Sequence, residues 1–275
     1  MRINCLATAL LLWVPVSAAA QAVRPIYLES MTPTDLALLH VAIGAIAFLY
    51  ASVGHAGASG YIAVLTLAGL AATVVRPTAL VLNILVATLT TYQFYRAGYF
   101  AWNRFWPFAA LSVPAAFLGG YIHIPTDLFK ILVGIILLLS AARFAVRTED
   151  PSATRFPPLA VALAVGAGLG LLSGLTGTGG GIFLTPLMLL LGWATTKETA
   201  AVSAPFILVN SISGLSGFIS SGRPLPAIAG SLAIVAVAAG GLGGFYGSRR
   251  LPVSAIRRLL AVVLLVAGLK LLLGG

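Results

Sequence analysis

Charged residues are scarce in this sequence: Lys, Arg, Asp and Glu together make up 8% of its 275 residues. A soluble domain of ordinary composition carries about 25% charged residues. With 60% hydrophobic residues, the chain cannot cover a water-facing surface with polar side chains. The composition therefore predicts a polytopic membrane protein.

Cysteine and acidic side chains are also few. The single cysteine, Cys5, excludes a disulfide framework and a cysteine-based metal site. Asp35, Asp127 and Glu198 stand at the ends of apolar segments, so no carboxylate is expected at mid-membrane. We therefore predict no carboxylate proton relay, no dedicated cation site, no metal and no cofactor.

A basic stripe is missing although the formal net charge is +10. The Lys and Arg residues are scattered through short loops without interleaved aromatic residues, which argues against nucleic acid as a partner. Charge in short loops instead fixes the orientation of membrane helices. A nucleotide-binding phosphate loop is absent too, since no Lys followed by Ser or Thr comes after the glycines of any loop.

The N-terminal 22 residues have the pattern of a secretory signal. Arg2 precedes an apolar run over residues 5–14, and small residues follow over 17–20. The apolar run is too short to span a bilayer comfortably. We interpret residues 1–22 as a signal peptide, cleaved near Ala20 or Ala22, or as an uncleaved N-terminal anchor.

Apolar segments fill most of the remaining chain, and only helices satisfy the backbone of such continuous runs in lipid. The segments cover approximately residues 35–52, 61–75, 77–95, 104–122, 128–146, 158–173, 182–193, 198–219, 227–247 and 253–272. They predict an all-α fold. The second and seventh segments are short and could be half-helices or re-entrant pieces, which leaves either eight or ten crossings.

A polar linker over residues 147–157 separates two similar membrane repeats, 35–146 and 158–272. Glycines 54, 57 and 60 match glycines 174, 177 and 180 at an offset of about 120 residues, and two later groups match in the same order. Five segments per repeat is an odd number. The second repeat would therefore be inverted, as in transporters whose sites form where two inverted repeats meet.

The distribution of basic residues predicts the orientation. With a cleaved leader the mature N-terminus lies outside, and most Arg and Lys residues then fall on the cytoplasmic side, as membrane proteins prefer. In this arrangement Arg76 and Arg223 belong to loops on the outside.

The most unusual stretch is Ser173–Pro186, which reads SGLTGTGGGIFLTP. Irregular backbone at membrane depth must be buried in protein or line a wet cavity. Because glycine adopts positive φ, several amides can converge where this loop turns into a helix near Ile182, which would make an anion site. A single glycine in a membrane helix often only permits close packing, so both interpretations stay open for each one.

The first repeat has an equivalent loop, SVGHAGASGY, over Ser52–Tyr61. His55 could donate to an anion, carry a proton near neutral pH, or make only a structural hydrogen bond. Asn83 and Asn210 lie in apolar helices after each loop, where they could join helices or line a solute path.

The predicted substrate-binding residues come from these stretches. They are Gly54, His55, Gly57, Ser59, Gly60, Asn83, Ser173, Gly174, Thr176, Gly177, Thr178, Gly179, Gly180, Gly181 and Asn210. In this hypothesis the amides of both loops hold a small anion, and one half of the chain rocks against the other to expose it on alternate sides.

The two loops, with the segments ALVLNILVA and KETAAVSAPFILVNS that follow them, resemble the TauE/SafE family of sulfite exporters and related permeases. The resemblance extends from about residue 36 to the C-terminus. The second loop is close to the family's glycine-rich signature, and the first departs from it at His55, Ala56, Ala58 and Ser59. The resemblance implies a multi-pass transporter of the bacterial inner membrane that moves sulfur-containing anions such as sulfite or organosulfonates.

Two other classes of protein stay open. A membrane assembly factor that transports nothing would explain the helices but not two matched polar loops. An intramembrane enzyme could use His55 with Ser52 or Ser59, but no carboxylate or second histidine stands near enough in the sequence to orient the imidazole. We therefore predict no catalytic residues. The expected partners are a small anionic solute and the lipid bilayer, and a homo-oligomer is left open.

Overall fold

The computed structural model describes residues 31–52, 55–145 and 154–247, with residues 261, 262, 264, 265, 268, 269, 272 and 273 near the C-terminus. The described residues up to Leu38 and those from Leu39 onward belong to two separate units. In the first unit, Thr32 caps the start of a helix: the Asp35 amide donates to Thr32 Oγ1 at 3.2 Å. The predicted signal or anchor, Gly54 and residues 147–153 of the predicted linker lie outside the described residues.

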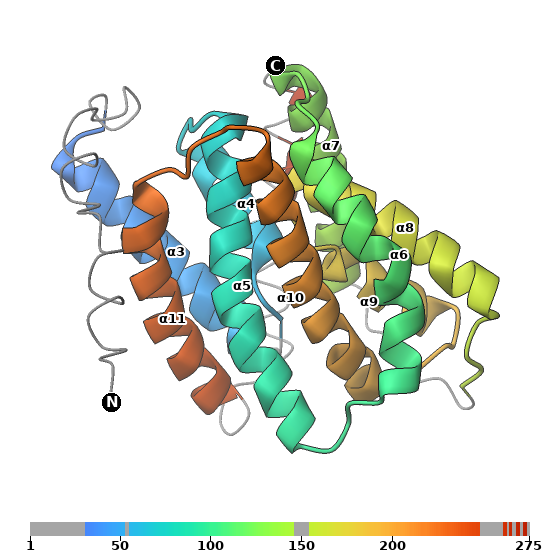
Figure 1. The fold of residues 1–275 in the computed structure, drawn as a ribbon. Helices are drawn as coiled ribbons and strands as arrows, with labels where there is room; N and C mark the ends of the chain where they lie inside the picture. The colour runs from blue at the N-terminus through green and yellow to red at the C-terminus, as the bar shows by residue number, and fades with distance from the viewer. Residues whose placement is uncertain are drawn as a thin grey trace, which may run out of the picture. The chain divides into compact units, whose positions relative to one another are not determined.

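Within these ranges the chain folds into nine helices, and no strand occurs among the residues described (Figure 1). The helices are α3 (Pro33–Ser52), α4 (Ala58–Leu67), α5 (Ala72–Arg96), α6 (Trp102–Tyr121), α7 (Thr126–Ala145), α8 (Leu159–Thr176), α9 (Gly181–Leu190), α10 (Thr196–Ser220) and α11 (Ile228–Gly247). The described residues between 261 and 273 are helical as well. Four helices, α3, α5, α8 and α10, are long and apolar enough to cross a membrane. The all-α prediction is confirmed.

The order of helix lengths is the same in the two halves of the chain. Helices α4, α5 and α6 contain 10, 25 and 20 residues, and α9, α10 and α11 contain the same numbers in the same order. Helices α4 and α9 are each about 15 Å long, half the thickness of a hydrocarbon core of about 30 Å. Neither can cross a bilayer alone, which excludes ten full crossings and fits the half-helix interpretation.

Two predicted boundaries are wrong. Segment 61–75 is not one helix, because α4 ends at Leu67 and a turn through Gly69 (φ +81°) precedes α5. Helix α5 then includes Arg76 and Pro77, since proline near a helix start costs few hydrogen bonds. The offset between repeats also differs: α4 begins at Ala58 and α9 begins at Gly181, 123 residues later. Gly57 therefore corresponds to Gly180 rather than to Gly177.

Small residues bring α6 and α8 into backbone contact. Residues Gly166, Gly170 and Gly174 of α8 follow one another at intervals of four and face α6. A Cβ atom added to any of them would lie 2.1 to 2.2 Å from the backbone oxygen of Phe108, Ser112 or Ala116, respectively. Since the facing residue numbers rise together, the two helices run parallel. Such spacing of small residues is how membrane helices approach closely.

Helix α10 packs against α6 in the same manner. Ser213 Oγ donates to the carbonyl oxygen of Val113 at 2.5 Å, and a Cβ on Gly217 would lie 2.0 Å from the carbonyl oxygen of Phe117. Helix α9 in turn contacts α10 through a hydrogen bond of 2.9 Å from Thr185 Oγ1 to Ser203 Oγ. We call α6, α8, α9 and α10 bundle A.

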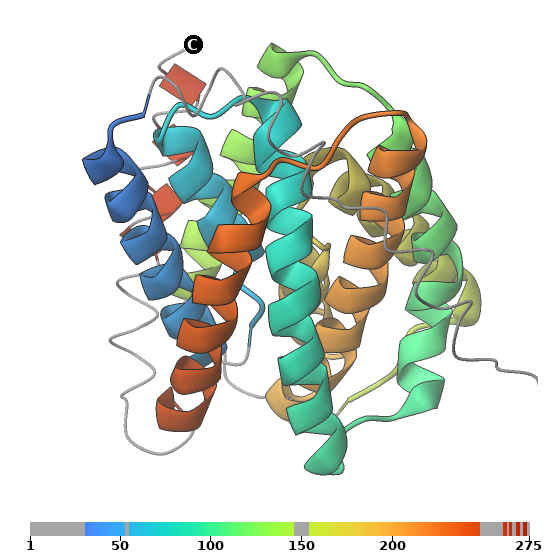
Figure 2. The same ribbon diagram turned by 60° about the vertical axis from the view of Figure 1, so that its left-hand side comes forward.

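A second group of helices surrounds α11. His40 Nε2 and Ser231 Oγ lie 3.0 Å apart between α3 and α11, and a Cβ on Gly243 would lie 2.2 Å from the carbonyl oxygen of Phe48. Helix α11 also lies beside α5 in both views (Figure 1, Figure 2), and α4 packs on α5. We call α3 from Leu39 onward, α4, α5 and α11 bundle B.

The two bundles do not coincide with the two repeats that the sequence predicts. Helix α6 belongs to the first repeat but packs on α8 and α10 of the second, whereas α11 belongs to the second repeat but packs on α3 and α5 of the first. The predicted repeats would thus exchange one helix each. The long helices α5 and α10 pack together where the bundles meet.

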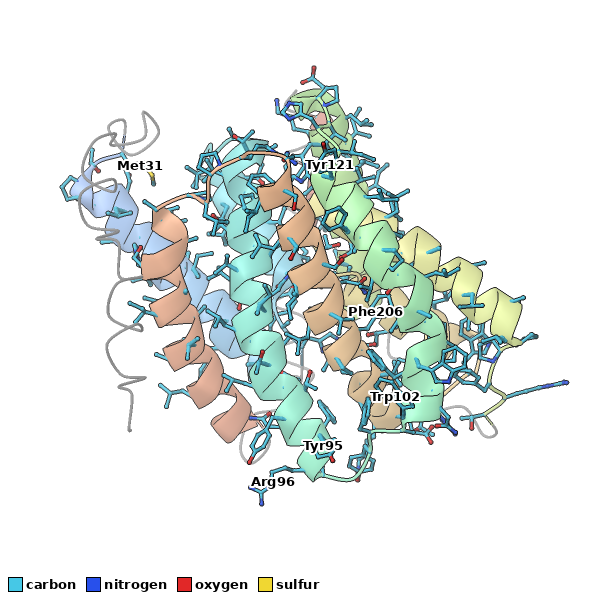
Figure 3. All side chains as sticks on the ribbon, in the orientation of Figure 1. Met31, Tyr95, Arg96, Trp102, Tyr121 and Phe206 are labelled. Atoms are coloured by element: carbon cyan, nitrogen blue, oxygen red, sulfur yellow. The ribbon has the colours of Figure 1, made fainter. Side chains whose placement is uncertain are left out.

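Aromatic side chains mark the ends of the helices. Figure 3 shows Tyr95, Arg96 and Trp102 at one end and Tyr121 at the other. Tyr95 and Trp102 are 66% and 65% exposed, although such large side chains are buried in most soluble proteins. Their placement fits the aromatic belts that membrane proteins carry at both interfaces.

Candidate functional site

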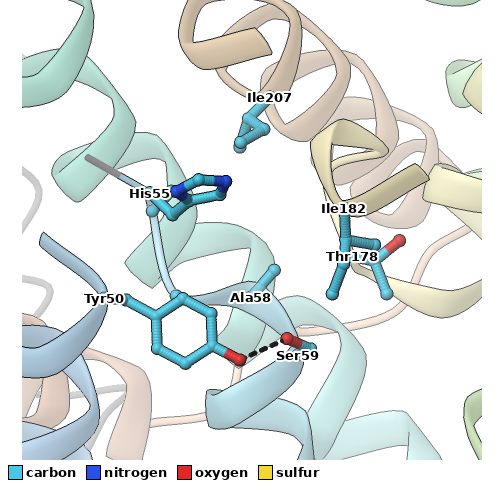
Figure 4. Close-up of a pocket in the computed structure, with 9 residues that line it drawn as sticks. Tyr50, His55, Ala58, Ser59, Thr178, Ile182 and Ile207 are labelled. Carbon is cyan, nitrogen blue, oxygen red and sulfur yellow. Dashed lines mark hydrogen bonds between the residues drawn. The ribbon is translucent and has the colours of Figure 1, made fainter. Parts of the chain in front are cut away.

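The two glycine loops line one pocket (Figure 4). Bundle B contributes the end of α3, the first loop and the start of α4, whereas bundle A contributes the second loop, α9 and α10. The lining residues are Tyr50, His55, Ala56, Gly57, Ala58, Ser59, Thr178, Ile182 and Ile207. The structure therefore brings together loops that lie more than a hundred residues apart in the chain, and places them where the bundles meet.

The pocket is small in this conformation. Its cavity volume is about 10 Å³. That volume is enough for about one water molecule. A solute of several heavy atoms would therefore need the two loops to move apart before it could enter.

Both half-helices begin at this pocket. Their N-cap residues are Gly57 (φ +96°) and Gly180 (φ +76°), and the second loop contains two more glycines at positive φ, Gly177 and Gly179. The first turn of a helix has amides without intrahelical partners and carries the positive end of the helix dipole. Two such ends that face one space favour a bound anion.

Three consecutive amides of the second loop are unused. Those of Thr178, Gly179 and Gly180 make no hydrogen bond with any residue that the structure describes, whereas the Gly177 amide donates to the carbonyl oxygen of Ser173 at 2.8 Å. A buried amide without a partner costs free energy comparable to a lost hydrogen bond. These amides are therefore available to a ligand with acceptor oxygens.

The first loop offers fewer free amides. Its His55 amide donates to the carbonyl oxygen of Tyr50 at 2.9 Å, and the Tyr50 and Ser59 hydroxyls lie 2.6 Å apart in a hydrogen bond (Figure 4). The amides of Ala56 and Gly57 have no partner among the described parts of the chain. The first loop thus contributes two donors from residues that line the pocket.

Polar side chains from two long helices reach the second loop. Asn83 Nδ2 of α5 donates to the carbonyl oxygen of Gly177 at 3.3 Å. A Cβ added to Gly179 would lie 3.0 Å from Ser211 Oγ of α10 and 3.3 Å from Asn83 Nδ2. Asn83 Oδ1 and Ser211 Oγ are buried and have no partner in the described structure. Each such atom costs about 1–3 kcal/mol, which points to a functional reason for keeping it.

Of the predicted glycines that the structure describes, Gly57 lines the pocket, and the others do not. Gly177, Gly179 and Gly180 belong to the second loop beside the pocket, and the other three lie within helices. Gly60 lies inside α4, where a Cβ would meet Ile46 of α3 at 2.4 Å, and Gly174 lies inside α8 against the backbone of α6. Gly181 is the first residue of α9, and a Cβ there would meet Ile207 at 2.4 Å. For these positions close helix packing, the alternative interpretation, explains the glycine.

Other predicted residues surround the second loop without lining the pocket. Thr176 Oγ1 donates to the Leu172 carbonyl oxygen at 2.6 Å and lies 3.1 Å from Thr178 Oγ1. The buried Ser173 hydroxyl has no described partner. Asn210 Nδ2 donates to a carbonyl oxygen of its own helix, so the structure gives it no contact with either loop. No group of three or more His, Cys, Asp or Glu residues that could hold a metal occurs among the residues searched.

Arg76 is the strongest candidate that the sequence interpretation missed. Instead of lying in an outer loop, it is 3% exposed, and its Nη2 donates to the carbonyl oxygens of Gly119 and Gly174, both at 2.9 Å. A Cβ on Gly177 would lie 2.9 Å from the carbonyl oxygen of Arg76. In the sequence, Arg76 and Pro77 stand directly before an apolar run. A proline at that place is typical of a helix start, and this could have indicated that Arg76 belongs to the helix.

Half-helices that meet end to end inside a bundle of membrane-length helices are typical of membrane transporters. The chain belongs to the TauE/SafE family: residues 38–271 match the family model described as "Sulfite exporter TauE/SafE". It is also similar to the "Probable membrane transporter protein y4hK" of Sinorhizobium fredii (strain NBRC 101917 / NGR234), with 43% identity over 244 residues, 87% of this chain and 99% of that protein. No solved structure matches. The protein is therefore a membrane transporter, and the family predicted from the two loops is confirmed.

Proposed function

We propose that this transporter moves a small anion that binds between the two glycine loops. The observation that carries the proposal is that α4 and α9 both begin at one pocket, with unused amides beside it. None of the lining residues is Lys or Arg. Helix dipoles and neutral donors would then balance the negative charge, which suits a solute with one negative charge better than a polyanion.

The chemistry of the pocket is consistent with a sulfur oxyanion or an organosulfonate. The hydroxyls of Ser59 and Thr178, which line the pocket, and the amides of Gly179 and Gly180, in the loop beside it, would donate to sulfonate oxygens. On the same pocket, Ile182 and Ile207 provide an apolar wall for a carbon chain. Since the family description names sulfite, sulfite and short organosulfonates are the first solutes to test, in a protein that we place in the bacterial inner membrane.

Alternating exposure would require the loops to separate. Moving one sequence half against the other would break the backbone contacts of α6 with α8 and α10, and those of α11 with α3. Moving bundle A against bundle B leaves these contacts intact and opens the pocket between them. The repeats would still be inverted, because three helical segments follow the half-helix in each one, an odd number.

Flux into proteoliposomes tests the proposal. The purified protein should transport sulfite or an organosulfonate with saturable kinetics. Replacing Gly180 by Ala should reduce that flux at least about tenfold, because a side chain there is strained at φ +76° and would meet Phe206 at 2.8 Å.

Gly222→Ala is the matched control, since Gly222 has nearly the same φ, +78°, but nothing lies within 4 Å of a Cβ at that position. The control carries the same backbone strain away from the pocket and should keep most of its flux. Parental flux in Gly180→Ala, or no flux for any anion of a broad panel, would contradict the proposal.

A further inference from the structure

Arg76 connects the two bundles. It lies in the second turn of α5, in bundle B, but its guanidinium binds carbonyl oxygens of bundle A: Gly119 near the end of α6 and Gly174 near the end of α8. Arg76 Nη1 also donates to the carbonyl oxygen of Ile122 at 3.4 Å. These carbonyls are the negative ends of helix dipoles, which attract a cation.

The charge of Arg76 has no carboxylate partner among the residues described, where the ion pair found is Arg104 with Glu198. A buried cation is costly unless it is fully hydrogen-bonded. The Nε atom of Arg76 is buried and lacks a partner in the described structure. The guanidinium is thus held by main-chain oxygens alone and keeps one donor unused.

Arg76 also touches the second glycine loop directly. Its main chain packs against Gly177, whose neighbour Thr178 lines the pocket. Its side chain holds Gly174, in the last turn of α8 before that loop. A movement that opens the pocket between the bundles would pull α5 away from α6 and α8, and so would break these hydrogen bonds.

A second arginine shares one of the same carbonyl groups. Arg223 Nη2, in the connection after α10, donates to the carbonyl oxygen of Gly120 at 2.6 Å, and Arg76 Nη2 lies 3.5 Å from that oxygen. Two like charges on one acceptor repel each other, which lowers the cost of releasing either. Arg223 binds the end of α6 but neither α8 nor the loop in any described contact, so it is a natural control for Arg76.

We infer that Arg76 is a positioning residue that holds the two bundles together at the pocket, on the side of the membrane where α5 begins. When the bundles separate, its guanidinium releases the carbonyl oxygens of Gly119 and Gly174. The anion that leaves the pocket can then bind the guanidinium in place of these carbonyl oxygens, because a guanidinium binds two oxygens of an oxyanion in parallel. This inference rests on the proposed anion transport for its ligand, but the holding role can be tested without any flux.

The experiment measures access to the pocket from each side of the membrane. Ala58, which lines the pocket, is replaced by Cys in a Cys5→Ser background, so that no other cysteine is present. A membrane-impermeant thiol reagent is then applied to right-side-out and to inside-out vesicles. The variants compared are Arg76 intact, Arg76→Gln, Arg76→Lys and Arg223→Gln.

We expect Arg76→Gln to raise labelling at least about fivefold from the side where α5 begins and to leave labelling from the other side unchanged. Arg76→Lys keeps the charge but cannot hold two helix ends at once, so it should show a smaller increase on the same side. Arg223→Gln should label like the parent. A general loss of packing would instead raise labelling from both sides.

Parental labelling in every Arg76 variant that inserts, or equal increases from both sides, would overturn the inference. If Arg76→Gln fails to insert into the membrane, the labelling of Arg76→Lys tests the inference instead. Increased labelling from one side, in a protein that transports neither sulfite nor an organosulfonate, would support the holding role of Arg76 and reject the proposed substrate. A failure of the inference can therefore be distinguished from a failure of the proposed function.

Discussion

At the scale of single residues, glycine does two different things in this protein, and the backbone angle separates them. Gly177, Gly179 and Gly180 adopt positive φ and turn the chain at the pocket. Gly60 and Gly174 are ordinary helical residues whose missing side chain lets a neighbouring helix approach. Only the first kind frees amides for a ligand.

Ser211 allows a test that separates binding from folding. Its hydroxyl is buried beside Gly179 without a described partner, so Ser211→Ala removes an unsatisfied group and should leave thermal stability unchanged or slightly raised. If the hydroxyl binds the anion, the KM for transport should rise about tenfold, the equivalent of about 1.4 kcal/mol.

The control is Ser216→Ala on the same helix, where the hydroxyl is exposed and donates to the carbonyl oxygen of Ile212. It should leave KM at the parental value. An unchanged KM in Ser211→Ala, measured on protein of parental stability, would remove Ser211 from the site.

At the scale of helices, length and apolar runs predicted most of the fold. The half-helices α4 and α9, the positions of the long helices and the glycine loops were all readable in the sequence. The start of α5 was not, because Arg76 in an apolar segment suggests a loop until its partners are known. Those partners are carbonyl groups at the ends of α6 and α8, and no local pattern encodes a contact across 43 or 98 residues.

The candidate site was predictable only in part, for the same reason. Left-handed and helical glycines look identical in the sequence, so Gly174 was grouped with Gly177. In the sequence, Ser211 is one of several polar residues along an apolar segment, and nothing there distinguishes it from Ser203 or Ser213. Its importance comes from its position next to Gly179 of the second loop. Tyr50 lies before the first loop and lines the pocket because α3 brings it there.

The contact between α6 and α8 makes a prediction about stability. Gly174→Ala places a methyl group where the carbonyl oxygen of Ala116 lies 2.1 Å away, and such overpacking costs about 1–3 kcal/mol. Gly168→Ala, on the same helix with nothing within 4 Å, should instead stabilise α8 by up to about 1 kcal/mol. Thermal unfolding in detergent should therefore shift in opposite directions, and equal shifts would contradict the packing.

At the scale of the whole molecule, two ways of moving are open to a transporter made of repeats, and they differ in which helices travel together. Either the first repeat moves against the second, or bundle A moves against bundle B. Bundle A joins helices of both repeats through backbone contacts, and bundle B does the same. We therefore expect the bundles, rather than the repeats, to move as bodies.

Cross-links distinguish the two motions. In a Cys5→Ser protein, the pair Arg104→Cys and Glu198→Cys joins α6 to α10 within bundle A, where the native side chains form an ion pair at 2.7 Å. The pair His40→Cys and Ser231→Cys joins α3 to α11 within bundle B. Both pairs connect the first repeat to the second, so they would stop any movement between repeats. We expect transport to survive both cross-links.

The flux of each double-cysteine variant is measured before cross-linking, after cross-linking with a reducible reagent, and after that cross-link is cleaved. Each variant therefore serves as its own control. Loss of flux on cross-linking that returns on cleavage would show that the repeats, rather than the bundles, are the moving bodies.

The exchange of α6 for α11 also bears on how the protein is made. The face of α6 between Phe108 and Gly120 finds its partners in α8 and α10, and the last of these is complete at Ser220. A ribosome needs roughly 5–20 s to add the intervening residues. During that interval α6 has no α10 to pack against, so we expect the two predicted repeats to complete their packing together.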